Sequence, residues 1–294
     1  MNISEYESSQ ETKFHGHGDF PFNIYLCSIP LDFSIVPVHW HNDMEIIYIK
    51  KGRGKITINL IPFEVSQGDI MIVPPGHLHS IAQLSDHTME YENIIFQLSM
   101  LMAPLSDPCT QKFFEPLLQG KIRFDYQYSP GCTLYSVLSD RLNAMDEICK
   151  TFPSGYQLAI KGQLFLFFYN LASSIQAPHR PDNDALNRLK DILKYVEINY
   201  HQKISVADAA KICGFSKSHF MKFFKNNMSM SFTNYLNDYR LTIAARLLLS
   251  SSEPIVTIAV DTGFETLSYF NRLFRRKYQC TPSVFRKRNY NSEN

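Results

Sequence analysis

The first third of the chain alternates apolar and polar residues in short runs that glycine and proline interrupt. Branched and aromatic residues gather in five such runs, at residues 24–26, 45–49, 55–60, 70–73 and 93–96. Runs of this length, rich in Ile, Val, Phe and Tyr, are typical of β-strands. The pattern predicts a closed or sandwiched antiparallel sheet between residues 22 and 97.

Apolar residues take helical spacing after the predicted sheet. Residues 133–150 and 156–175 carry apolar side chains three and four positions apart, which predicts two amphipathic helices. Their apolar stripes either pack on the protein's own sheet or contact a partner, and we expect Leu142 to be an exposed stripe position. A third helix is predicted from about residue 184 to residue 200. Residues 177–184 contain two prolines and no apolar run, which indicates a linker.

One sequence pattern near the C-terminus occurs twice. Residues 206–215 match residues 255–264 at a shift of 49, and the following residues match at a shift of 50. In each copy a short helix is followed by a glycine, Gly214 or Gly263, and then by a second helix with apolar residues at helical spacing. Glycine supplies the positive φ that a tight turn between helices needs. The pattern predicts two helix-turn-helix units, and the second helix of such a unit enters a DNA major groove.

The charges are divided unevenly between the two parts of the chain. From residue 184 onward there are 17 Lys and Arg against 9 Asp and Glu, and before it 12 against 19, so the total of +1 hides a basic part and an acidic part. A basic part is expected where a protein faces phosphate, although a solvated basic surface has the same composition. The duplicated pattern favours the first interpretation.

The last hundred residues resemble the DNA-binding domain of the AraC/XylS family of bacterial transcription regulators. The resemblance rests on the paired units, on Tyr235-Leu, Arg240-Leu, Ala244-Ala245 and Leu248-Leu249 between them, and on Thr281-Pro-Ser-Val-Phe-Arg286 after them. Ser229 and Gln279 stand where the family commonly has Gly after each recognition helix. A residue other than Gly in that position costs only about 1 kcal/mol, so we expect an altered helix end and unchanged DNA binding.

Two segments of the predicted sheet resemble the signature motifs of the cupin barrel, which regulators of this family often carry as their sensor domain. The first motif has His39-Trp-His41, Glu45 and Gly52, and the second has Gly68, Pro74-Pro-Gly76 and His79. Gln83 takes the place of the usual Asn at the end of the second motif.

The polar residues of the two motifs are the candidate ligand-binding residues. His39, His41 and Glu45 have the same parity along an extended segment, so their side chains leave one face of the sheet, and a neighbouring strand could bring His79 beside them. Three imidazoles and a carboxylate suit a transition metal, and the matching positions are ligands in metal-binding cupins. In sugar-sensing regulators similar residues line the pocket or only maintain the fold. We favour effector binding by these four residues and expect no resident metal or other cofactor.

The candidate DNA contacts are the outward residues of the two recognition helices. Phe220, Phe223 and Phe224, like Phe270, Leu273 and Phe274, are predicted to face the core. The remaining residues are Ser216, Lys217, Ser218, His219, Met221 and Lys222 in the first unit and Thr266, Leu267, Ser268, Asn271 and Arg272 in the second. The resemblance implies base contacts by Ser218, Met221 and Lys222 and by Leu267, Ser268 and Arg272. Arg272 is the best base reader because a guanidinium can donate two hydrogen bonds to guanine, whereas Lys222 equally suits a phosphate.

The sequence therefore predicts a multidomain protein. Its parts are an N-terminal arm (1–20), an all-β cupin-like barrel (21–103), a helical support and dimerisation region (104–176), the linker (177–184) and an all-α double helix-turn-helix domain (185–290). No run of 18 apolar residues predicts a membrane span, and the polar N-terminus does not resemble a signal peptide. The six scattered cysteines are expected to be free thiols of a reducing cytoplasm.

The expected function is regulation of transcription. We expect a cytoplasmic homodimer that binds double-stranded DNA and responds to a small-molecule effector, and the family resemblance suggests a sugar. The alternative is a metal-dependent cupin enzyme fused to a DNA-binding domain. Tight metal retention together with turnover would favour that alternative.

Overall fold

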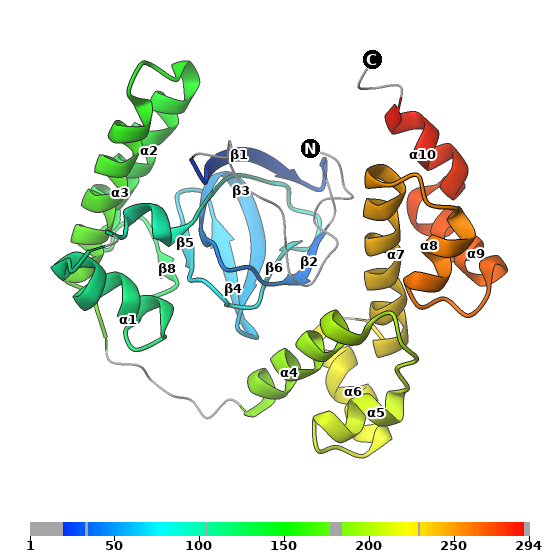
Figure 1. The fold of residues 1–294 in the computed structure, drawn as a ribbon. Coiled ribbons are helices and arrows are strands. Elements are labelled where there is room, and N and C mark those ends of the chain that lie inside the picture. Colours follow the sequence, from blue (N-terminus) through cyan, green and yellow to red (C-terminus); the bar gives the residue numbers. More distant parts are fainter. Residues whose placement is uncertain (1–19, 33–34, 104, 177–183, 229, 291–294) are drawn as a thin grey trace. The chain divides into compact units, whose positions relative to one another are not determined.

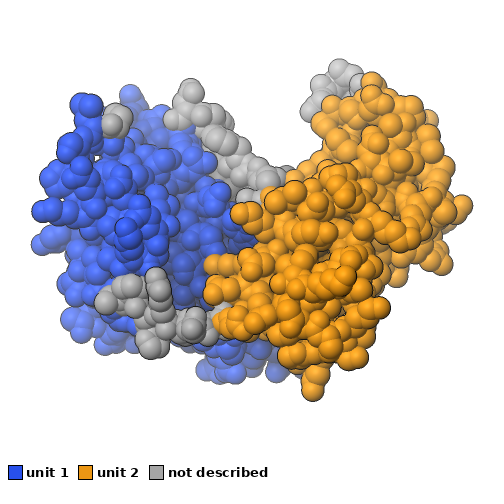
Figure 2. Space-filling model, turned by 60° about the horizontal axis from the view of Figure 1, so that its bottom comes forward, with its two compact units in different colours: residues 1, 11–182 blue, residues 2–10, 183–294 orange. Residues whose placement is uncertain are grey.

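The computed structural model describes residues 20–32, 35–103, 105–176, 184–228 and 230–290. These residues form two compact units, one up to residue 176 and one from residue 184 (Figure 2). Apart from Phe20 and Asp184, the predicted arm and the predicted linker lie outside the described residues, as does Ser229. Asp184 is the first residue of a helix, so that helix begins inside the segment predicted as linker.

The first unit contains the predicted antiparallel sheet, in which every strand pairing is antiparallel. Its strands are β1 (Phe22–Ile29), β2 (Ile35–His39), β3 (Met44–Ile58), β4 (Ile61–Ser66), β5 (Ile70–Val73), β6 (His79–Gln83), β7 (Met89–Phe96) and β8 (Gln127–Tyr128). One layer has the order β1-β7-β3-β5-β8, and β2, β6 and β4 pair around the other half of β3 (Figure 1). The confirmed fold class is a sheet-rich N-terminal domain followed by a helical C-terminal domain.

Strand β3 corrects the prediction of separate strands at residues 45–49 and 55–60. Its first half pairs with β5 and β7, and its second half pairs with β4 and β6, so one strand belongs to both layers. Gly52 lies between the halves with a φ of +76°, and a Cβ there would be 1.9 Å from the Thr88 carbonyl oxygen. Only glycine fits this approach, so the strand turns from one layer into the other without ending.

Two helices, α2 (Tyr135–Thr151) and α3 (Tyr156–Ala172), cover the β1-β7-β3-β5 layer (Figure 1). Shorter helical segments precede them at Leu98–Leu101, Thr110–Phe114 and α1 (Glu115–Leu118). The predicted stripes pack on the sheet: Leu138, Leu142 and Leu164 share one core with Ile94 and Phe96. Leu142 is fully buried, so the expectation that it is exposed was wrong.

The second unit is helical. Its helices are α4 (Asp184–Asn199), α5 (Val206–Ile212), α6 (Lys217–Met228), α7 (Phe232–Ser250), α8 (Ile255–Asp261), α9 (Leu267–Tyr278) and α10 (Pro282–Tyr290). The pairs α5/α6 and α8/α9 are the two predicted helix-turn-helix units, and α7 connects them (Figure 1). The N-terminal part of α7 contacts Phe220 and Phe224 of the first helix-turn-helix unit. Its C-terminal part joins the core of the second helix-turn-helix unit.

Candidate functional site

The four candidate ligand-binding residues come together inside the sheet-rich unit. His39 and His79 form a register pair of β2 and β6, and Glu45 lies at the start of β3. One ligand atom from each of His39, His41, Glu45 and His79 lies within 4.8 Å of all the others. All four residues are at most 2% exposed. The expected neighbouring strand does bring His79 beside the other three residues, but the parity argument was wrong, because β2 ends at His39 and a bend at Asn42 and Asp43 separates His41 from β3.

Backbone carbonyl groups orient the three imidazoles. Nδ1 lies 2.9 Å from the Pro37 oxygen in His39, 3.0 Å from the Asp43 oxygen in His41 and 2.9 Å from the His77 oxygen in His79. A carbonyl oxygen only accepts hydrogen bonds, so each Nδ1 carries a proton and donates it. In His41 and His79 the other ring nitrogen, Nε2, lies beside Glu45, and a ring whose Nδ1 donates to a carbonyl oxygen is arranged as in histidines that bind metals.

Glu45 is the negative charge at the centre of this cluster. Its Oε2 lies 2.8 Å from Nε2 of His41 and 2.8 Å from Nε2 of His79. Burial by itself raises the pKa of Glu45, but the charges and hydrogen bonds of His79 and His41 lower it, and the resulting pKa is well below its ordinary value. The carboxylate therefore stays ionised in a buried place, where it needs a cation or N–H donors beside it.

The two helix-turn-helix units present their recognition helices in the same way. Ser216 accepts a hydrogen bond from the His219 amide at the start of α6, and Thr266 accepts one from the Tyr269 amide at the start of α9. Side-chain oxygens at this position satisfy amide groups that have no partner within the helix. Gly214 and Gly263 have positive φ angles of 65° and 87°, as the duplicated pattern requires.

All eleven candidate DNA contacts are exposed. They are Ser216, Lys217, Ser218, His219, Met221, Lys222, Thr266, Leu267, Ser268, Asn271 and Arg272. The residues assigned to the core are buried in both helices except Phe223, which is half-buried and packs against Phe215. The residues selected from the sequence thus all lie on the outward surface of the recognition helices.

Arg272 is held by its neighbours. Its guanidinium lies 5.2 Å from the ring centre of Tyr269, and the Tyr269 hydroxyl accepts a hydrogen bond of 2.9 Å from the buried Asn237 of α7. A cation over an aromatic face is stabilised by the ring quadrupole. The link from α7 through Tyr269 fixes the base of the Arg272 side chain and leaves the guanidinium exposed.

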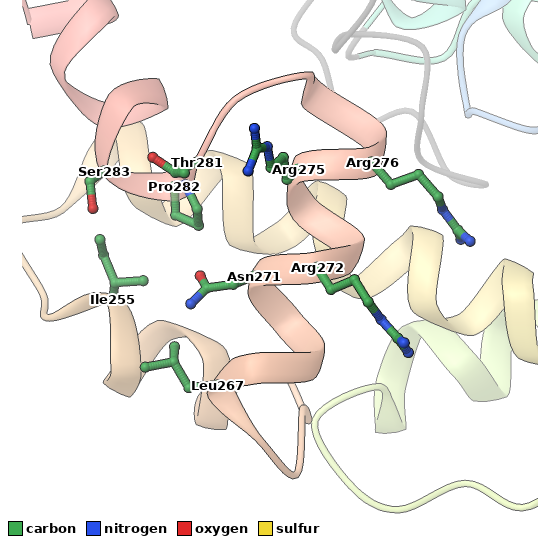
Figure 3. A pocket seen from close by; sticks show the side chains of 9 residues that line it. All are labelled: Ile255, Leu267, Asn271, Arg272, Arg275, Arg276, Thr281, Pro282 and Ser283. Atoms are coloured by element: carbon green, nitrogen blue, oxygen red, sulfur yellow. The ribbon is translucent and has the colours of Figure 1, made fainter.

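A hollow of about 800 Å³ lies between α8, α9 and the start of α10. Ile255, Leu267, Asn271, Arg272 and Arg276 are among its lining residues, and Figure 3 shows the two arginine side chains extending away from Ile255 and Leu267. Arg275 and Arg276 are exposed basic residues that were not among the predicted DNA contacts. The duplicated sequence pattern could have identified Arg275, because it aligns with the basic residue Lys225 of the first helix-turn-helix unit.

Arg240 is a further residue whose role the sequence did not indicate. It is 8% exposed, and it donates hydrogen bonds to the carbonyl oxygens of Tyr200 (2.8 Å) and Gln202 (2.7 Å). Its guanidinium also lies 5.9 Å from the ring centre of Phe264. Arg240 therefore ties the end of α4 and the turn of the second unit to α7.

Gln279 occupies the helix end that was expected to differ from the family pattern. It has a φ of +55° and a ψ of 18°, which is the left-handed conformation that Gly usually adopts after a helix. Its side-chain amide donates a hydrogen bond of 2.8 Å to the Arg276 oxygen. The helix end thus keeps its usual geometry without glycine.

The fold and its exposed basic helices define a protein with a ligand-binding barrel and two DNA-binding units. Family models agree with both parts: residues 31–142 match the AraC-like ligand binding domain, and residues 209–288 match a helix-turn-helix domain. Within the described residues, no helix combines the length and the apolar character that crossing a membrane requires.

Known proteins are similar over most of the chain. The HTH-type transcriptional regulator YdeC of Bacillus subtilis is 23% identical over 96% of this chain and 97% of its own length. The transcriptional activator RhaR of Pectobacterium carotovorum is 25% identical, over 88% of this chain and 89% of its own. The crystal structure of ToxT from Vibrio cholerae is 18% identical, with a TM-score of 0.40, over 92% of this chain and 98% of that one.

The chain belongs to the AraC family of transcription regulators. It is a DNA-binding regulator with an effector-binding domain, and its relatives are regulators of transcription.

Proposed function

We propose that both recognition helices bind one double-stranded DNA site, α6 and α9 each in a major-groove segment. The observation that carries this proposal is that all eleven selected residues are exposed on two helices joined through α7. Successive major-groove segments on one face of B-DNA are about 34 Å apart. A footprint that covers two such segments, with affinity that falls steeply as salt rises, is the expected result. A footprint of one segment would contradict the proposal.

We further propose that the protein is a homodimer through the outer face of α3, and not through Leu142. Leu158, Phe165, Leu166 and Tyr169 lie at helical spacing on that face and are 77%, 41%, 44% and 74% exposed. An apolar stripe of this kind marks an interaction surface. Sedimentation of the Leu166→Glu protein should show monomers, while Ile198→Glu, at an exposed apolar position on α4, should leave the dimer intact. Equal behaviour of both variants would refute the α3 interface.

The effector is, in our proposal, a small carbohydrate that reaches His39, His41, Glu45 and His79. The support is the family's ligand-binding domain and the convergence of four polar side chains within it. Glu45→Gln should abolish the response of DNA binding to the effector and leave basal DNA binding unchanged. We place the regulator in the cytoplasm, where its DNA is, and assign it no catalytic activity.

A second candidate function concerns a metal ion, and the imidazole geometry favours it. Three rings that donate from Nδ1, two of them with Nε2 2.8 Å from the Glu45 carboxylate, form a donor set that fits Zn, Mn, Fe, Ni or Cu. The burial of all four residues also suits an ion better than a sugar ring. His39, His41, Glu45 and His79 would hold the ion, which would bind an oxygen atom of the effector as a Lewis acid.

Elemental analysis separates the two candidates. Protein isolated without added metal should contain near one ion per chain if the cluster is a metal site, and His79→Ala should release it. Little stoichiometric metal, together with effector binding, would support pocket lining. Substrate turnover by the metal-loaded protein would instead favour the enzyme alternative.

A further inference from the structure

A cavity of about 370 Å³ lies on the opposite face of the sheet from the imidazole cluster, between β1, β7 and the turn that joins α2 to α3. Its lining includes Asn23, Glu92, Asp146, Lys150, Phe152 and Tyr156. Along β7, Glu92, Ile94 and Phe96 share a side, and the last two belong to the core beneath the helices. The cavity is therefore separate from the four residues discussed above.

Glu92 gives this cavity an unusual polar group. Its side chain is 8% exposed, and its Oε1 lies 3.0 Å from Nζ of Lys50. Its Oε2 is buried and has no hydrogen-bond partner among the described residues. Burial raises the pKa of Glu92, which the Lys50 ammonium lowers only in part. An unsatisfied buried carboxylate oxygen is destabilising, so it calls for a partner that the described part of the chain does not supply.

Phe152 gives the cavity an exposed aromatic ring. It ends α2 with a φ of +45° and is 58% exposed, and its ring lies 5.2 Å from that of Tyr156. A bulky side chain in the left-handed region is strained, and this one does not recover the cost by burial. Strain and an exposed ring beside a cavity that has both apolar and charged lining residues are features of ligand sites.

The carboxylates that line the cavity are already paired with cations. Lys50 pairs with Glu92, and Lys150 lies 3.3 Å from Asp146 and 2.5 Å from the neighbouring Glu147. A charged ligand would have to displace one of these pairs. Hydroxyl groups both donate and accept, so they fit a lining of carboxylates, ammonium groups and the Asn23 amide. The rings of Phe152 and Tyr156 offer apolar faces to the carbon skeleton of the same ligand.

We propose that this cavity is a second small-molecule site, which takes a neutral, hydroxyl-rich ligand the size of a monosaccharide. A volume of about 370 Å³ is within the range of small-ligand pockets. Tyr156 is the first residue of α3, so a ligand here contacts the helix whose outer face we assign to the dimer. The site goes beyond the effector site proposed in the barrel.

The test is saturation-transfer NMR on the full chain with D-glucose, D-galactose, L-arabinose and L-rhamnose, and with the charged analogues D-glucosamine and D-glucuronate. At least one neutral sugar should bind at concentrations of about 1 mM, and more strongly than the charged analogues. Glu92→Gln and Phe152→Asn should each weaken binding roughly tenfold through loss of a hydrogen bond or a ring contact. Asn tolerates the left-handed conformation, so Phe152→Asn should melt no lower than the unchanged protein.

Matched controls decide where a sugar binds. Glu90→Gln changes a neighbouring carboxylate that pairs with Lys51, and it should leave binding unchanged. Binding lost in Glu45→Gln but retained in Glu92→Gln and Phe152→Asn would place the ligand in the barrel only, which refutes the second site and keeps the proposed effector site. Absence of binding by every neutral sugar would also overturn the second site, while the DNA footprint tests the regulator independently.

Discussion

The two helix-turn-helix units share one sequence pattern but are stabilised differently. In the first unit, Ser205 and Asp208 form reciprocal hydrogen bonds at the start of α5, whereas α8 of the second unit follows Pro254 without a side-chain cap. The second unit is instead tied to the rest of its domain. Lys277 of α9 lies 2.9 Å from Asp238 and 2.9 Å from Thr242, both on α7.

The turns show the same difference. A Cβ on Gly214 would lie 2.8 Å from Nη1 of the Arg188 side chain, while a Cβ on Gly263 would lie 2.5 Å from the Tyr200 carbonyl oxygen and 2.9 Å from Nε of Arg240. The first turn meets only the end of the Arg188 side chain of α4, which can move. The second turn meets the Tyr200 backbone and the buried Arg240 side chain, so duplicated sequences do not imply equal tolerance to mutation.

Replacement of the turn glycines should give the largest effect. Each Gly→Ala change places a Cβ in the left-handed region at a cost of about 1–2 kcal/mol. Gly263→Ala should lower the free energy of unfolding considerably more than Gly214→Ala, because its new methyl group meets the Tyr200 backbone and the buried Arg240. Chemical denaturation of both variants measures the difference. Equal losses would show that the second turn relaxes as easily as the first.

The second-largest effect is expected from the two recognition helices, because Arg272 of α9 and Lys222 of α6 are predicted to contact different parts of the DNA. Arg272→Ala should cost about 1–3 kcal/mol at one base pair and relax the sequence preference there, because two hydrogen bonds to guanine are lost. Lys222→Ala should weaken binding to all sequences alike if Lys222 meets phosphate. Binding to a library of sites with single base changes tests both variants. Arg272→Lys is the control that keeps the positive charge. If this variant kept the full sequence preference, Arg272 would not donate two hydrogen bonds to one guanine.

Removal of the Tyr269 ring that supports Arg272 should have a smaller effect on DNA binding. Tyr269→Leu removes the ring beneath the guanidinium, a contribution of about 0.5–1 kcal/mol at an exposed site. Tyr269→Phe keeps the ring and loses only the hydrogen bond from Asn237. We expect the Leu variant to lose preference at the Arg272 base pair and the Phe variant to retain most of it. The same loss in both would assign the effect to the hydrogen bond.

Loss of the Ser205–Asp208 cap of the first helix-turn-helix unit should have the smallest effect on stability, and this effect should depend on pH. Hydrogen bonds from Ser205 lower the pKa of Asp208 in the folded protein. A depressed folded-state pKa means that the stabilisation is present above the ordinary carboxyl range and is lost as the pH falls through the lowered pKa. Asp208→Asn should therefore reduce the difference in stability between neutral and acid pH. Asp261→Asn, at the exposed end of α8, is the matched control.

The sequence predicted the residues of the candidate sites better than it predicted how the elements around them pack. The cupin-like motifs identified His39, His41, Glu45 and His79, but these residues converge because two strands and the bend between them fold together, and not through alternation along one strand. Exposure along α6 and α9 followed from helical spacing, which is a property of the backbone alone. The direction of the stripes on α2 and α3 was undetermined, since burial of Leu142 depends on where the helices meet the sheet.

By itself the sequence determined the helices of the two helix-turn-helix units, the duplication, the charge division and the glycine turns, because each depends on residues close together in the chain. Only the tertiary structure decided that β3 spans both layers, that Arg240 joins α4, α7 and the second turn, and that Glu92 lies buried beside a cavity. These features arise between residues far apart in the chain, where packing and hydrogen-bond partners depend on the whole fold and not on local spacing.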